Sequence, residues 1–189
     1  MSIIDGFVRG PELGNTRFYM GSLMSFLISG NETQGKTAIV EGIARPGNEP
    51  PPHVHLWEDE IYYILEGRAE FFIEDQNESL VAGEGEIVFL PRGKAHALYL
   101  RSERFRFLLL AQAVEDQPVG LDAMFREISE SATSMDLPNE AVTYAAVDPV
   151  HVVTLGLRHG VQFLAPSDVK ERLPNYPGFG RNLAQQDEA

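Results

Sequence analysis

Two short segments decide the fold of this chain: GNEPPPHVHLWEDE at residues 47–60 and GEIVFLPRGKAH at residues 85–96. In the first segment His53 and His55 are two residues apart. Successive side chains of a β-strand point to opposite faces, so both imidazoles would project from the same face of a strand. The spacing therefore predicts a histidine pair that can act together.

Glu60 stands five residues after His55, and this odd offset would turn it to the other face of an unbroken strand. The pattern predicts a bend or bulge within Glu58–Asp59, with Glu60 opening the next strand. In the second segment Pro91-Arg92-Gly93 predicts a tight turn, because proline presets φ and glycine tolerates a positive φ. His96 follows that turn on a strand that can cross near the first pair.

Three imidazoles and one carboxylate form a good site for Fe, Mn, Ni, Cu, Co or Zn. We expect one divalent transition metal held by His53, His55, Glu60 and His96. Four protein ligands leave positions on an octahedral ion for water or substrate. The chain has no cysteine, so thiolate sites and disulfides are excluded. We assign the other two histidines, His151 and His159, to structural or surface roles.

The rest of the chain reads as many short strands followed by helices. Apolar or β-branched stretches separated by Gly, Pro and charged residues predict strands at residues 23–29, 37–44, 61–65, 69–73, 86–90, 95–100 and 104–111. The pattern favours a β-barrel or sandwich. We divide the chain into a lead-in (1–16), a barrel (17–117), a helical C-terminal appendage (118–165) and a surface tail (166–189).

Two helices are expected in the appendage. Leu121, Met124, Phe125 and Ile128 fall on one face of a first helix. A second helix would begin with Asp148 as its cap and Pro149 in its first position, and end before Gly160. Its buried stripe is expected to be Val150, Val153 and Leu157.

The charge balance limits the possible partners. Of 189 residues, 28 are acidic and 15 are basic, which gives a net charge of −13. Such a field repels nucleic-acid phosphates and anionic membranes, so we expect neither as a partner. No leader or membrane-spanning segment is evident, and a cytoplasmic protein is predicted. A homodimer is expected, with the N-terminal strands around residues 18–28 supplying its edge.

The two segments resemble the two motifs of the cupin superfamily. Gly47, His53, His55, Glu60 and Gly67 match every position of the first motif, and Gly85, Pro91, Gly93 and His96 match the second. The asparagine of the second motif is Leu100 here, which makes that part of a cavity more apolar. The resemblance implies an all-β fold: a single cupin β-barrel, a double-stranded β-helix of the jelly-roll type, with the short helical appendage at its C-terminal end.

The overall layout is similar to small single-domain quercetin 2,3-dioxygenase-like cupins, and Gly160-Val161-Gln162-Phe163-Leu164 matches the segment that ends their C-terminal helix. The resemblance implies a dioxygenase that cleaves a flavonol or similar aromatic enol with O2. Glu60 would then be both a metal ligand and the general base. By alternation, Tyr62, Ile64, Leu98 and Leu100 could line an apolar substrate pocket, although Ile64 and Leu98 also suit an ordinary barrel core.

Two other functions stay open at this point. One is another metal-dependent cupin enzyme, such as a small-acid dioxygenase, a decarboxylase or an isomerase. The apolar Leu98 and Leu100 beside His96 argue weakly against sugar-like substrates. The other is a non-catalytic cupin that binds a small molecule, for which an intact set of four ligands is not required.

Overall fold

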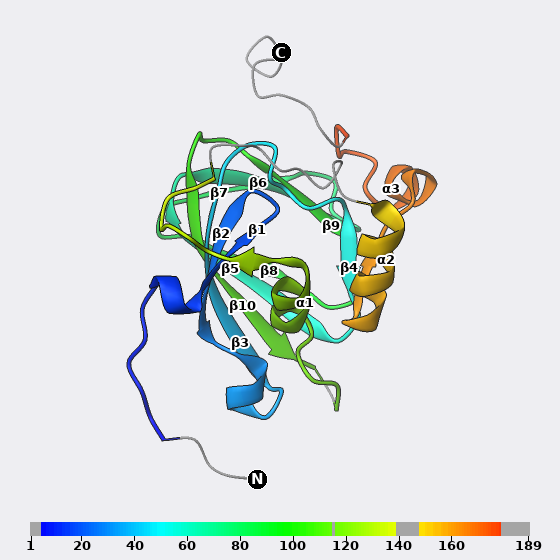
Figure 1. Cartoon of the computed structure of the whole chain (residues 1–189). Coiled ribbons are helices and arrows are strands. Elements are labelled where there is room, and N and C mark those ends of the chain that lie inside the picture. Colours follow the sequence, from blue (N-terminus) through cyan, green and yellow to red (C-terminus); the bar gives the residue numbers. More distant parts are fainter. Residues whose placement is uncertain (1–4, 115, 139–147, 179–189) are drawn as a thin grey trace.

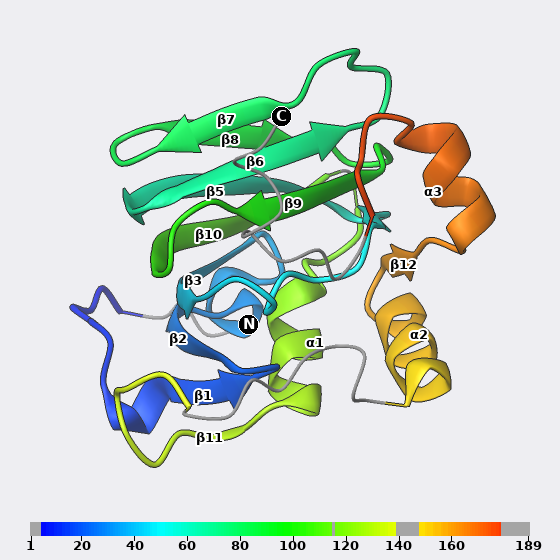
Figure 2. The same cartoon turned by 90° about the horizontal axis from the view of Figure 1, so that it is seen from above.

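The computed structural model describes residues 5–114, 116–138 and 148–178. These residues form two antiparallel sheets that face each other, one of seven strands in the order β11-β1-β2-β3-β10-β5-β8 and one of five in the order β12-β4-β9-β6-β7. Figure 1 and Figure 2 show α2 and α3 beside the β4 end of the five-stranded sheet, with α1 close to β1 and β2. The predicted all-β barrel is confirmed.

The strands are β1 (Thr16–Tyr19), β2 (Ser22–Ile28), β3 (Thr37–Ala44), β4 (His53–His55), β5 (Glu58–Glu66), β6 (Arg68–Ile73), β7 (Leu80–Gly83), β8 (Ile87–Leu90), β9 (His96–Leu100), β10 (Phe105–Ala113), β11 (Glu130–Ser131) and β12 (Val161–Phe163). The helices are α1 (Leu121–Ile128), α2 (Pro149–Arg158) and α3 (Pro166–Arg172), with short 3-10 turns at Leu13–Asn15 and Gly30–Thr33. Each predicted strand overlaps an observed one, but β7, β11 and β12 were not anticipated. None of the described helices is long and apolar enough to cross a membrane.

The main core lies between the two sheets. Alternation along β5 buries Tyr62 and Ile64 and leaves Tyr63 exposed, and β9 sends Leu98 and Leu100 inward in the same way. The inner faces of two facing sheets thus supply one continuous apolar layer. Helix α1 adds Leu121, Met124 and Phe125 to this core, so the first predicted helix and its buried face are observed.

A second, smaller core lies on the outer face of the five-stranded sheet. Leu173 and Tyr176, which follow α3, pack there against a group made of Val54, Phe72, Ala95, Ala97 and Tyr99. The described part of the predicted surface tail therefore contains a helix and a fully buried leucine. Residues 179–189 of that tail lie outside the described residues.

The predicted buried stripe of α2 is wrong. The cap is as expected, since the Asp148 side chain accepts from the Val150 N–H at 3.0 Å. However, Val150, Val153 and Leu157 are exposed, and α2 buries Val152 and Leu155 instead. The helix carries apolar residues around much of its circumference, so the 3.6-residue period does not select a single face.

The N-terminal strands do not present the open edge that we expected for a dimer. Strand β2 lies between β1 and β3, and β1 is bordered by the two residues of β11. The expected homodimer stays a prediction, and its edge is not β2.

Candidate metal centre

The four predicted ligands come together although they belong to two sheets. His53 and His55 lie on β4 and His96 lies on β9, where it is the direct register partner of His53. Glu60 reaches them from β5 in the opposite sheet. All four side chains are buried, and their nearest ligand atoms lie within 4.8 Å of one another.

The bend between the histidine pair and Glu60 occurs earlier than predicted. Strand β4 ends at His55, the bend is at Leu56 and Trp57, and Glu58 already belongs to β5. The bend moves the chain from one sheet to the other, so alternation starts afresh on β5. The tight turn before His96 is present, with Gly93 at φ 81° and its N–H donating to the His55 carbonyl at 2.9 Å.

Hydrogen bonds at the outer nitrogens fix the orientation of all three imidazoles. The Nδ1 atom of His53 lies 2.8 Å from the Pro51 carbonyl, and that of His96 lies 3.2 Å from the Lys94 carbonyl. The Nδ1 atom of His55 lies 3.1 Å from Oε1 of Glu58. Each partner can only accept, so each Nδ1 carries a proton, and a ring in its neutral form presents the lone pair of Nε2 to the cluster.

These Nε2 lone pairs face one another and Glu60. The Nε2 atoms of His53 and His96 are 3.1 Å apart, and Glu60 Oε2 is 3.3 Å from His96 Nε2. His55 Nε2 and Glu60 Oε2 are buried without a hydrogen-bond partner. Ligand atoms about 2.1 Å from a shared ion are separated by about 3.0–3.4 Å at octahedral to tetrahedral angles. The orphaned atoms and the spacing of His53, His96 and Glu60 fit a divalent transition metal, and His55 Nε2 lies 3.7 Å from Glu60 Oε1.

Electrostatics keep Glu60 ionised and His53 neutral. Burial raises the pKa of Glu60, but the imidazoles, His55 above all, outweigh burial and lower it to about 2. Burial, together with repulsion from His96 and His55, holds the pKa of His53 well below its usual range. An ionised Glu60 and a neutral His53 are in the protonation states that a metal ion requires of its ligands.

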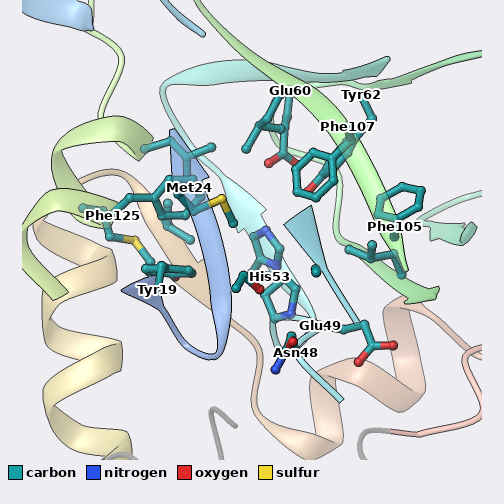
Figure 3. Close-up of a pocket in the computed structure, with 18 of the residues that line it drawn as sticks. Tyr19, Met24, Asn48, Glu49, His53, Glu60, Tyr62, Phe105, Phe107 and Phe125 are labelled. Atoms are coloured by element: carbon teal, nitrogen blue, oxygen red, sulfur yellow. The ribbon is translucent and has the colours of Figure 1, made fainter. Parts of the chain in front are cut away.

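The cluster borders a cavity of about 50 Å³ between the sheets. Figure 3 shows His53, Glu60 and Tyr62 around it, with aromatic rings on both sides. Of the predicted pocket residues, Tyr62, Leu98 and Leu100 line the cavity, whereas the fully buried Ile64 does not. The other lining residues are Tyr19, Ser22, Met24, Ala44, Asn48, Glu49, Pro50, Phe105, Phe107, Leu109, Leu121, Met124, Phe125, Val161 and Phe163.

The lining is mostly apolar, and its charged groups are carboxylates. Glu49 and Glu60 are the charged residues among those that border the cavity in the described part of the chain, and no lysine or arginine borders it. Glu49 accepts from the Leu100 N–H at 3.0 Å and from the Gly47 N–H at 2.6 Å. Burial, working against these two bonds, raises its pKa.

The C-terminal region contributes a strand directly beside the cluster, which the sequence did not reveal. Strand β12 pairs with β4, setting Val161 opposite His55 and Phe163 opposite His53. Three residues are too few to show a strand period, so the segment carries no strand signal of its own.

The two remaining histidines lie away from the cluster. His159 binds Glu127 through Nε2 at 2.9 Å, and His151 is exposed on α2. Both placements agree with the structural or surface roles that we assigned to them.

Comparison with known proteins locates a family within this region. Residues 42–111, which include all four cluster residues, match the family model of the cupin domain. An uncharacterized protein of Methanocaldococcus jannaschii is 32% identical over 79 residues, which make up 41% of this chain and 62% of that protein. The match thus spans less than two thirds of the relative.

Among solved structures, a predicted oxalate decarboxylase from Thermotoga maritima is 24% identical with a TM-score of 0.45, covering 49% of this chain and 81% of that one. The DMSP lyase DddQ from Ruegeria pomeroyi is 31% identical with a TM-score of 0.38, covering 44% of this chain and 41% of that one. Residues 42–111 thus match the cupin domain model, and the two antiparallel sheets have the cupin double-stranded β-helix fold.

Proposed function

We propose that this protein is a metal-dependent dioxygenase that cleaves a neutral, mainly apolar enol or phenol with O2, in the manner of the quercetinase-like cupins. The observation that supports this most strongly is the cavity: a buried His3Glu cluster borders apolar and aromatic walls, and the described residues of these walls include no lysine or arginine. A carboxylate substrate would meet Glu49 and Glu60 there without a cationic side chain to balance its charge.

Each residue of the site would have its own role in the proposed reaction. His53, His55, Glu60 and His96 would hold a divalent metal, which supplies a Lewis acid for the substrate oxygen and a site for O2. Glu60, ionised at neutral pH, would accept the proton of the substrate hydroxyl. The aromatic rings would exclude water from the resulting anion. Both atoms of O2 enter the product, so the reaction needs no external reductant.

The size of the cavity favours a small substrate. Pockets for drug-sized ligands have volumes of about 300–1,000 Å³, whereas this cavity has about 50 Å³. A flavonol would enter only if lining side chains moved aside, and a single-ring phenol or enol requires less displacement. Met24 and Met124, both on the wall, are the flexible side chains best suited to give way.

The test is to load the purified protein with Fe, Ni, Mn or Co and to measure O2 uptake with quercetin, with a catechol and with oxalate. We expect O2 consumption with loss of the flavonol or catechol absorbance, and no uptake after Glu60→Gln. Bound metal without O2 uptake, or consumption of oxalate alone, would refute the proposal in favour of another cupin enzyme. A protein that binds no metal would support the small-molecule-binding alternative.

A further inference from the structure

Glu58 is a fully buried carboxylate that the proposed reaction does not use. It is 1% exposed and precedes Glu60 by two residues on β5, so both side chains point to the interior. Three N–H groups converge on it: His55 Nδ1, Gly120 N and Leu121 N. By accepting these three hydrogen bonds, the Glu58 carboxylate links β4 to the start of α1, which is distant from it in sequence.

One end of this arrangement is the metal cluster. Glu58 Oε1 lies 3.1 Å from His55 Nδ1, which places the ring proton on Nδ1 and the lone pair on Nε2. His53 and His96 meet backbone carbonyls at Nδ1, so among the three imidazoles His55 alone has a carboxylate partner at that position. A carboxylate partner makes an imidazole a stronger metal ligand and fixes its orientation.

The other end is the first turn of α1. Glu58 Oε2 accepts from Gly120 N at 2.6 Å, and Oε1 accepts from Leu121 N at 3.1 Å. Gly120 packs closely against the backbone of His159, since a Cβ on it would lie 2.1 Å from the His159 carbonyl oxygen, so this position excludes any side chain. Leu121, Met124 and Phe125 of the same helix line the cavity. The position of this cavity wall is therefore tied to the orientation of His55 by one side chain.

We propose that Glu58 is a positioning residue that sets the tautomer of His55 for metal binding and couples this ligand to helix α1. The inference rests on the metal role proposed above but not on the oxygenase reaction. Removing an outer partner of a metal-bound histidine typically weakens metal binding by about 10- to 100-fold. We expect a loss of this size for Co²⁺ when Glu58 is removed.

The experiment compares the parent with Glu58→Ala, Glu58→Gln and Asp122→Asn. Asp122 is the matched control: it is a buried carboxylate in the first turn of α1 that accepts from Gly30 N at 3.0 Å and touches none of the three imidazoles. Three quantities are measured: the Co²⁺ dissociation constant, the tautomer of His55 by ¹⁵N NMR of the metal-free protein, and hydrogen exchange of Gly120 and Leu121 with and without Co²⁺.

We expect Glu58→Ala to weaken Co²⁺ binding and to shift His55 towards the Nε2–H tautomer. Co²⁺ should protect the two amides in the parent and in Asp122→Asn, but not in Glu58→Ala. Glu58→Gln keeps the side-chain volume and decides the question if the alanine variant fails to fold. Parent-like affinity and tautomer in the Glu58 variants would overturn the inference, as would an equal loss in Asp122→Asn. A parent that binds Co²⁺ but consumes no O2 would remove the oxygenase proposal alone.

Discussion

The Nε2 atoms of His53 and His96 lie 3.1 Å apart although the residues are 43 positions apart in the chain. The two residues are direct partners across β4 and β9, so the backbone register sets the distance. Each ring is also held at Nδ1 by a carbonyl oxygen. The site is thus preorganised by the sheet, and its ligand positions depend little on flexible loops.

We predict that His53→Ala or His96→Ala lowers bound metal to less than a tenth of the parent value and leaves the barrel folded, because each removes one ligand while the sheet pairing stays. Elemental analysis after reconstitution and circular dichroism measure the two effects. His159→Ala, which changes a histidine outside the cluster, should retain the metal. Parent-like metal content in His53→Ala would exclude His53 as a ligand.

Glu60→Gln should reduce turnover more than metal binding. We expect a loss of at least about 100-fold in kcat, since a general base typically contributes 10²–10⁴-fold, and a smaller loss in metal affinity because three imidazoles remain. Asp59→Asn is the control. The Asp59 carboxylate is next to Glu60 in the chain, but it accepts from the Arg92 N–H and lies outside the cluster. Undiminished kcat in Glu60→Gln would show that another group takes the proton.

The buried face of α2 can be tested with two leucines on the same helix. Leu155 is 0% exposed and Leu157 is 50% exposed. Leu155→Ala should lower the free energy of unfolding by about 2–5 kcal/mol, and Leu157→Ala should change it by no more than about 0.5 kcal/mol. Urea denaturation of both variants gives the comparison. Equal effects would contradict the observed orientation of the helix.

A salt bridge near the N-terminus predicts how the stability of the fold depends on pH in the acid range. Arg9 binds both carboxylate oxygens of Glu32 at 2.8 and 2.9 Å, and this hydrogen bonding, opposed by burial, lowers the pKa of Glu32 from 4.5 to about 2. A lowered pKa contributes stability that is fully present above about pH 4.5 and is lost as the pH falls towards about 2.

We therefore expect Glu32→Gln to lower Tm at pH 7, with the difference from the parent shrinking steadily between pH 5 and pH 2. Arg9→Gln should show the same flattened profile, because it removes the other partner of the pair. Thermal unfolding followed by circular dichroism across this pH range measures the difference. A constant gap in Tm would show that the pair does not stabilise the fold through the charge of Glu32.

Parts of the cluster were predictable from sequence because short local patterns set them. A two-residue spacing on a strand sets His53 beside His55, and the Pro-x-Gly turn delivers His96 at the start of β9. The location of the bend was not predictable, because both Glu58–Asp59 and Leu56–Trp57 satisfy the change of side that Glu60 requires. Only the pairing of β5 with β8 and β10 selects the second.

Long-range pairings explain the other differences between the predicted and the observed structure. Strand β12 forms by pairing with the edge of β4, and the sequence of Val161–Phe163 alone does not predict this pairing. Glu58 was likewise read as part of a bend, since its three donors come from His55 and from residues more than 60 positions away. Helix α2 has apolar side chains on several faces, so packing against the barrel, and not its own period, chose Val152 and Leu155.

The pairing of β12 with β4 also sets an order of events during synthesis. The strand that carries His53 and His55 has β9 on one side and β12 on the other, and β12 ends at Phe163. A ribosome must therefore release nearly the whole described chain before the ligand strand gains its second neighbour. The part of the cavity wall formed by Val161 and Phe163 is thus completed only after all four cluster residues have been synthesised.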